Sequence, residues 1–164
     1  MKKYIAFVLV FLLALCSCSQ NVEEDTFDIL CELLAYSGEN REEAALYSSS
    51  ADIGEFGYID DGIKTTLYGE RCHKDYFPLV EEYSICLFER QAGEVALFKC
   101  YSRSDTDTIA QMCLERADLI KVMLNGTEHE EKSGAIRIEI HGRYVLFSFS
   151  DHSDKIAEYF VELV

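Results

Sequence analysis

The sequence predicts an α+β fold, with a four-stranded, mainly antiparallel sheet built from two ββα units and an N-terminal helix covering the sheet. The first observation is a pair of apolar runs, 83–89 and 94–101, joined by a tight turn and followed by a long stretch with helical spacing. The second observation is that the plan returns in residues 135–149 and 151–163. A hairpin followed by a helix that folds back over it buries two apolar faces against each other, so two such units can form one core.

Length and charge limit the classes of protein to consider. A chain of 164 residues suits a single domain. We place this domain at 26–164, after a signal peptide at 1–17 and a polar, acidic tether at 18–25. The 15 basic and 30 acidic residues give a net charge of −15. Such a surface repels phosphate backbones and anionic headgroups, so we expect no nucleic acid as partner and no electrostatic docking on a membrane. A cationic partner is compatible with this charge.

The N-terminus has the three parts of an export signal. Lys2 and Lys3 precede an apolar run at 4–15, and small or thiol residues follow it. This run is shorter than the roughly 20 residues that a helix needs to cross a bilayer core of about 30 Å. We therefore expect a signal peptide and not a permanent membrane span.

The end of this signal, Leu15-Cys16-Ser17-Cys18, resembles the lipobox of bacterial lipoproteins. Leu15 stands three places before Cys18 and the small Ser17 directly before it, so Cys18 is the expected attachment site for lipid, palmitate included. Cys16 fits less well, because the residue before it is Leu15. An ordinary cleaved signal or an uncleaved anchor helix is the alternative. Two or more acyl chains on one residue hold a protein on a membrane, so the predicted location is the extracytoplasmic face of the cell membrane.

The domain begins with the helix that should cover the sheet. Asp25 or Thr26 can cap its start, and Gly38 marks its end. Its apolar stripe at positions i, i+3, i+4 and i+7 consists of Phe27, Leu30, Cys31 and Leu34.

The next segment, 39–78, is the least regular part of the chain. A short helix is predicted inside it, beginning after Asp60-Asp61 and ending at Tyr68-Gly69. Long irregular segments of this kind are covering layers or carry binding surfaces.

The first hairpin is apolar on both faces of its strands, and strands of this kind need cover on both sides. The alternating positions are Ile85 and Leu87 against Cys86 and Phe88, and Val95 and Leu97 against Ala96 and Phe98. The following helix can be capped by Ser104 or Asp105 and stops at Asn125-Gly126. Its buried stripe is predicted to be Ile109, Cys113, Ala117, Ile120 and Leu124.

The second hairpin has one apolar and one polar face. Ile136, Ile138 and Ile140 alternate with Arg137, Glu139 and His141. A two-residue His141-Gly142 turn would pair Ile138 with Val145 and Ile136 with Phe147, which leaves the charged face to water.

The closing helix should start at Ser150 or Asp151 and turn Ile156, Phe160 and Val164 toward the sheet. We expect it to lie beside the long helix on one face of the sheet. The N-terminal helix must then cover the other face.

The cysteines favour packing over chemistry. Two of the seven belong to the signal, and the other five, which include no C-x-x-C pair, are Cys31, Cys72, Cys86, Cys100 and Cys113. Cys31, Cys86 and Cys113 occupy apolar positions, where cysteine packs as a small hydrophobe. A three-residue turn at 92–94 would place Cys86 directly across from Cys100, and a turn of two or four residues would not. We favour buried thiols over a disulfide at this pair.

The strongest candidate for catalysis is Cys72-His73, a thiol with an imidazole next to it. Adjacent side chains seldom point together, and no oxyanion loop or orienting carboxamide is recognisable. His129-Glu130-Glu131 most simply forms a solvated loop, with a weak divalent-cation site as the alternative. No phosphate loop, nucleophile elbow or metal motif occurs, so we predict no catalytic residues, no cofactor, no metal site and no enzymatic activity.

Five stretches in the C-terminal two thirds form a recognisable pattern of hydrophobic and turn positions: Leu67-Tyr68-Gly69, Glu82-Tyr83-Ser84, Glu94-Val-Ala-Leu-Phe-Lys99, Ile140-His-Gly-Arg-Tyr-Val-Leu146 and Ser150-Asp151. In these stretches the chain resembles the DUF4358 family of clostridial lipoproteins. The stretch 70–75 departs from the expected pattern. Members of this family are small lipid-anchored proteins without an assigned activity, so the resemblance implies a location and leaves the activity open.

These inferences predict a lipid-anchored binding or interaction module outside the cytoplasm, attached to the membrane at Cys18. Its partner would be an envelope protein or a small ligand. The alternatives are an accessory subunit of an envelope complex and an envelope hydrolase or thiol enzyme that uses Cys72 and His73.

Overall fold

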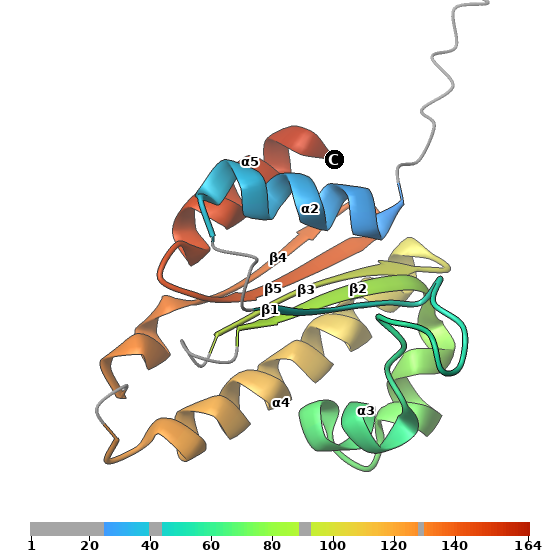
Figure 1. Ribbon diagram of the computed structural model, residues 1–164, viewed down its shortest axis with the longest axis horizontal. Coiled ribbons are helices and arrows are strands. Elements are labelled where there is room, and N and C mark those ends of the chain that lie inside the picture. Colours follow the sequence, from blue (N-terminus) through green and yellow to red (C-terminus); the bar gives the residue numbers. More distant parts are fainter. Residues whose placement is uncertain (1–24, 40–43, 89–92, 128–129) are drawn as a thin grey trace, which may run out of the picture.

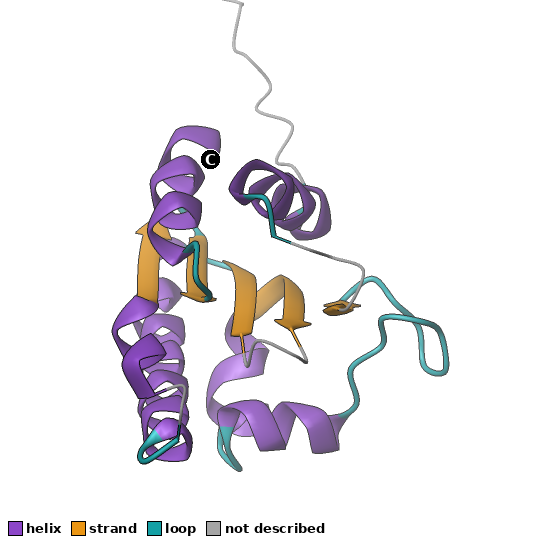
Figure 2. Cartoon of the chain, turned by 60° about the vertical axis from the view of Figure 1, so that its left-hand side comes forward, coloured by secondary structure: helices purple, strands orange, loops and turns teal. Residues whose placement is uncertain are grey.

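The computed structural model describes residues 25–39, 44–88, 93–127 and 130–164. These residues form an antiparallel sheet with helices on both faces (Figures 1 and 2). The sheet order is β1-β2-β3-β5-β4. The strands are β1 (Ala44–Ser48), β2 (Val80–Phe88), β3 (Gly93–Cys100), β4 (Ile136–His141) and β5 (Tyr144–Phe149). The helices are α2 (Thr26–Ser37), α3 (Asp61–Tyr68), α4 (Thr106–Leu124) and α5 (Ser153–Leu163).

The predicted α+β class with an antiparallel sheet is confirmed, and the predicted number of four strands is wrong. The additional strand, β1, lies in the irregular segment and pairs with β2 along the edge of the sheet. Its five residues show no clean alternation of polar and apolar side chains, because most of them are only partly buried. Pairing with β2, rather than a buried face of its own, therefore defines this strand.

The first hairpin, β2 with β3, occupies the centre of the sheet as predicted. Its register pairs Cys86 with Val95 and Cys100 with Val80. Four residues, 89–92, separate the paired Phe88 and Gly93. Of the turn lengths left open by the sequence, the pairing therefore agrees with four residues and not with the three that would place Cys86 opposite Cys100.

This register separates the two cysteines of the hairpin. Cys86 belongs to the core under α2, and Cys100 to the core under α4. The two thiols therefore do not face each other, and the prediction of buried thiols at this pair is confirmed, since all five described cysteines are thiols.

The two faces of the sheet carry two separate cores. One core lies under α4 and α3 and contains Phe98 and Phe147. The other lies under α2 and α5 and contains Val95, Leu97 and Leu146. Two-sided cover was expected, but the placement of α5 beside the long helix is wrong, because α5 shares its layer with α2 (Figure 1).

Three serines explain the placement of α5. Ser148 alternates with Phe147 along β5, so its side chain projects from the α2 face. The Ser148 hydroxyl donates to Ser153 Oγ at 2.9 Å, and Ser153 Oγ also accepts the Ser150 N–H at 2.8 Å. These bonds hold the first turn of α5 against the face of the sheet that α2 also covers. They also start the helix at Ser153, later than the expected Ser150 or Asp151.

Helix α2 begins and ends as predicted. The Asp25 side chain accepts the Phe27 N–H at 2.7 Å, and Gly38 has a φ of 84°, which favours glycine. The expected stripe is partly wrong, because Phe27 is 36% exposed and Cys31 is half-buried. The helix packs against both the sheet and α5, so its buried side is broader. That side consists of Ile29, Leu30, Leu33 and Leu34.

The second hairpin turns one residue later than expected. Ile138 pairs with Phe147 and Ile140 with Val145, so the loop is Gly142-Arg143. A shift of two positions in the pairing leaves each side chain on its predicted face. Glu139 is only half-exposed, because α5 lies over this end of the sheet.

Candidate functional site

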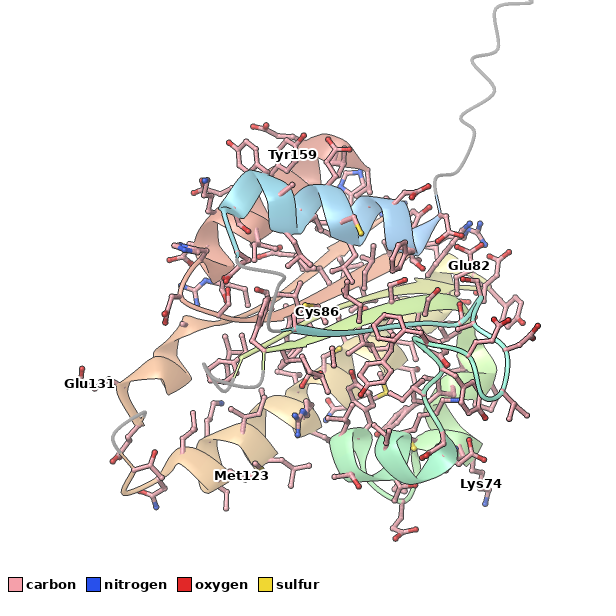
Figure 3. All side chains as sticks on the ribbon, in the orientation of Figure 1. Lys74, Glu82, Cys86, Met123, Glu131 and Tyr159 are labelled. Atoms are coloured by element: carbon pink, nitrogen blue, oxygen red, sulfur yellow. The ribbon has the colours of Figure 1, made fainter. Side chains whose placement is uncertain are left out.

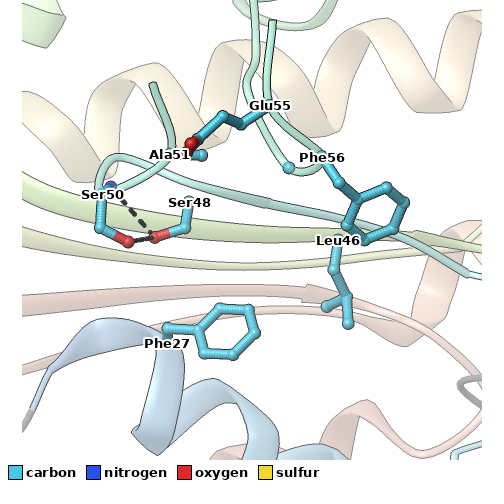
Figure 4. A pocket seen from close by; sticks show the side chains of 8 residues that line it. Phe27, Leu46, Ser48, Ser50, Ala51, Glu55 and Phe56 are labelled. Atoms are coloured by element: carbon cyan, nitrogen blue, oxygen red, sulfur yellow. Dashed lines mark hydrogen bonds between the residues drawn. The ribbon is translucent and has the colours of Figure 1, made fainter. Parts of the chain in front are cut away.

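An open concavity lies beside β1, between the start of α2 and the loop 49–58. We call it the β1 groove. It has a volume of about 300 Å³, near the lower limit for small-molecule sites. Figure 4 shows Leu46 between the rings of Phe27 and Phe56. The groove is lined chiefly by Phe27, Leu46, Ser48, Ser50, Glu55 and Phe56.

The loop 49–58 is held in place by its backbone. The Ser48 N–H donates to the Gly57 carbonyl at 2.9 Å, so the loop folds back along the outer edge of β1. Gly57 has a φ of 90°, and a Cβ there would lie 3.3 Å from the Leu46 carbonyl oxygen. This position therefore requires glycine for both its backbone angle and its close approach. The loop that forms this wall of the groove therefore has a defined conformation.

The tip of this loop exposes large apolar side chains. Phe56 is 91% exposed and Ile53 is 84% exposed. Burying one such side chain against a ligand would contribute about 1.5–3 kcal/mol. The arrangement is therefore suited to holding an apolar group.

The polar side of the groove is acidic. Glu55 Oε2 accepts the Asp52 N–H at 3.2 Å. The described residues supply no donor to its other carboxylate oxygen. The hydroxyls of Ser48 and Ser50 lie 2.8 Å apart and bond to each other. A ligand with an apolar group and a cationic or N–H donor group fits this combination.

The side chains of Cys72 and His73 lie in different environments, which do not favour a joint catalytic role. Cys72 is buried, and burial raises the pKa of its thiol, although a hydrogen bond with Thr65 opposes this rise. His73 Nε2 lies 2.8 Å from Thr65 Oγ1 and 3.0 Å from the Asp61 carbonyl oxygen, so the ring is directed to α3. A neutral, buried thiol is a poor nucleophile. Neither Cys72 nor His73 lines the β1 groove.

A second cavity, of about 200 Å³, lies between α3 and α4 over the end of the sheet. Its polar group is a buried ion pair in which Glu94 Oε2 accepts from Arg116 Nε at 2.8 Å and Nη2 at 2.7 Å. The Tyr68 hydroxyl donates to Glu94 Oε1 at 2.8 Å. Burial and the charge of Glu94 raise the pKa of Tyr68 well above its usual value. Met123 lies at the mouth of this cavity, on the outer side of α4 (Figure 3).

This second site has little capacity left for a polar ligand. Both Glu94 oxygens already have partners, and the rest of the lining is mainly apolar. We interpret the ion pair as a structural element. Neither Glu94 nor Arg116 was a candidate from sequence, because nothing in their spacing of 22 positions shows that they meet.

The remaining candidates have different outcomes. The predicted lipid site Cys18, together with Cys16 and His129, lies outside the described residues. Glu130 Oε2 accepts the Gly126 N–H at 3.1 Å, so this side chain is bonded to the turn that follows α4. Among the described side chains, no three His, Cys, Asp or Glu are grouped to hold a metal ion. No helix in the described ranges has the length and apolarity of a membrane span.

Comparison with known proteins gives no further guide to the site. The chain matches no family model, no curated protein and no solved structure. The resemblance to DUF4358 lipoproteins therefore stays a prediction from sequence. The geometry of the β1 groove has to carry the functional argument by itself.

Proposed function

We propose that the protein is a non-catalytic binding module, anchored by lipid at Cys18 to the extracytoplasmic face of the cell membrane. The observation that carries the proposal is the β1 groove, with Phe27 and Phe56 on its walls and Glu55 at its side. Exposed aromatic side chains beside a carboxylate are groups that a small-molecule site uses to hold an apolar group and to fix a polar one. The ligand would join an apolar group to a cationic or N–H donor group. The net charge of −15 favours such a ligand.

The position of the groove suits a membrane-bound protein. Phe27 is the second residue of α2, and eight positions separate Cys18 from Thr26. A segment of this length spans at most roughly 30 Å when fully extended. A lipid at Cys18 would keep the groove close to the membrane surface, so the ligand would be a molecule of that surface or of the surrounding envelope.

The alternatives differ in their support. The exposed Ile53 and Phe56 also favour an accessory subunit, because a protein partner could cover both side chains. A thiol enzyme gains no support from Cys72, since burial raises the pKa of this thiol and His73 is directed to α3. The resemblance to DUF4358 lipoproteins supports the same location for the chain.

The anchor is tested in cells that express the full chain and are fed radiolabelled palmitate. Cys18→Ala should abolish both labelling and retention in the membrane fraction, whereas Cys16→Ala should preserve both. Persistent labelling of Cys18→Ala would show that another residue carries the lipid.

The groove is tested by photocrosslinking in the same membranes. A photoreactive phenylalanine at Phe56 should give a discrete adduct, and the same residue at Val122, which is 75% exposed on α4, should not. Phe27→Ser on the opposite wall should reduce the Phe56 adduct. Equal adducts from Phe56 and Val122, or no effect of Phe27→Ser, would contradict binding in the groove.

A further inference from the structure

Strand β4 has one side of its backbone unused by the sheet. It is the last strand in the order β1-β2-β3-β5-β4 and pairs with β5 alone. In a hairpin with a two-residue loop, the flanking pair, here His141 and Tyr144, is hydrogen-bonded. Hydrogen bonding alternates along a strand, so the N–H and C=O groups of the three isoleucines of β4 point away from β5. These isoleucines are Ile136, Ile138 and Ile140.

The outer edge is accessible. Ile140 is 43% exposed, and Ile138 is partly buried. In the described part of the chain, the Ile136 carbonyl on this edge accepts a hydrogen bond from the Arg137 guanidinium at 2.8 Å. The donor belongs to the next residue of the same strand, so a backbone N–H of a neighbouring strand could take its place.

The sequence of β4 is complementary to itself in one register. We propose that β4 pairs antiparallel with β4 of a second copy, with the two-fold axis at Ile138, so that two sheets join into one. Arg137 then lies opposite Glu139 of the second copy, and Glu139 opposite Arg137 of that copy. Opposite charges that face each other directly across a strand pair are favourable. On the other side of the seam, Ile136 meets Ile140 of the second copy and the two Ile138 side chains meet each other.

Backbone pairing and charge together disfavour the other registers. Only the outward-facing isoleucines can form hydrogen-bonded pairs, so the two-fold axis lies either at one of them or at a residue between two of them. An axis at Arg137 or Glu139 forms two such pairs and places two like charges directly opposite each other. The axis at Ile138 forms three hydrogen-bonded pairs within the six residues of β4. An axis at Ile140 places Glu139 opposite His141, and an axis at Ile136 moves Ile140 out of the pairing. The register with the greatest overlap is also the one with matched charges.

The helices beside β4 present apolar surface to the same partner. Val161 is 47% exposed and lies two turns after Asp154, whose carboxylate pairs with the Arg137 guanidinium on β4. Leu114 is 50% exposed on α4, which also contacts β4. The two side chains lie on helices that contact β4 from opposite faces of the sheet, so they are available to the helices of the second copy.

The symmetry agrees with attachment to a membrane. A two-fold axis normal to the sheet places α2 of both copies on the same side of the joined sheet, so both tethers can reach one bilayer. The proposal does not depend on the β1 groove, since β1 lies at the opposite edge. The net charge of −15 on each copy opposes association, and salt screens this repulsion over about 8 Å at physiological ionic strength.

The register is tested by cysteine crosslinking of the full chain in membranes. Ile138→Cys should form a disulfide-linked dimer on mild oxidation, because hydrogen-bonded partners have Cα atoms about 5.5 Å apart, within the range for a disulfide. Ile136→Cys is the matched control on the same strand and face. Its thiols would be four residues out of register, so it should not crosslink. Failure of Ile138→Cys to crosslink, or equal crosslinking of both variants, would overturn the proposal.

A charge exchange tests the same seam without cysteines. Arg137→Glu places two pairs of carboxylates across the seam, and Glu139→Arg places two pairs of guanidinium groups there. Each variant alone should associate at least tenfold more weakly than the natural chain. Co-expression of the two variants with different epitope tags restores opposite charges at both pairs, and the tags should then co-purify at the natural level. Undiminished self-association of the single variants, or no recovery in the mixture, would overturn the proposal.

Discussion

The buried ion pair under α4 gives a sharp test of the structure. Replacing Arg116 with Met removes the charge that faces Glu94 and keeps an apolar chain of similar length. The side chains of Glu94 and Arg116 are 2% and 11% exposed, so the remaining carboxylate would be buried without its partner. Removing one partner of a buried pair costs about 3–5 kcal/mol. Because Arg116 keeps some contact with water, we expect a value near 3 kcal/mol.

Urea denaturation measures this loss of stability. With a slope of about 1–3 kcal/mol per molar urea, the unfolding midpoint of Arg116→Met should fall by roughly 1–3 M. The double variant Glu94→Gln/Arg116→Met should recover most of the loss, since it leaves no buried charge and keeps an acceptor for the Tyr68 hydroxyl. Arg71→Met is the control, because that side chain is 67% exposed and its pair with Asp75 is screened by water, so its unfolding midpoint should stay close to that of the natural chain. A loss below 1 kcal/mol, or a double variant as unstable as the single one, would refute the burial of this pair.

Four further predictions test the layers and the burial of their side chains. Phe98→Ala should lower the free energy of unfolding by about 3–5 kcal/mol, because the ring is fully buried on the central strand. Glu139→Ala should change that energy by no more than about 0.5 kcal/mol in dilute protein. Deleting residues 19–38 should uncover the α2 face and produce a domain that binds a hydrophobic dye; an unchanged midpoint without dye binding would show that α2 is dispensable. At pH 8, native Cys100 and Cys113 should react slowly with iodoacetamide, because burial raises the pKa of Cys100 to about 11 and that of Cys113 well above its usual value, so both thiols stay protonated. Peptide mapping against denatured protein measures this protection, and equal alkylation in both states would contradict it.

Sequence-based prediction was most accurate for features that depend only on neighbouring residues, such as helix caps and the spacing of buried residues along a helix. The N-cap of α3 at Asp60 and its C-cap at Gly69 follow from a side-chain hydrogen bond and a backbone angle that glycine tolerates. The buried stripe of α4 follows from helical spacing, and all five predicted positions are buried. Long-range partners decided the rest. The register of the first hairpin depends on its loop length, and α5 is amphipathic enough to pack on either face of the sheet.

The candidate site was harder to predict for the same reason. Helical spacing placed Phe27 in the buried stripe, but the ring lies at the rim of the β1 groove. Phe56 and Ile53 are the residues from which the sequence could have indicated the groove. They are large and apolar, yet they lie in a glycine-containing loop without helix or strand periodicity, so no buried position is predicted for them. Leu46 gave no such signal, because it joins the groove only through the pairing of β1 with β2.

The layer formed by α2 and α5 joins the two ends of the domain. The rings of Tyr36 and Tyr159 stack with centroids 3.9 Å apart, and the Tyr159 hydroxyl donates to Glu32. A ribosome makes α2 first, and the 11 residues of α5 come last. Contacts between such distant parts of a chain slow folding. A nascent chain that ends before Ser153 therefore leaves one face of its sheet half-covered, and stop codons in the final helix should yield proteolysed fragments instead of a smaller stable domain.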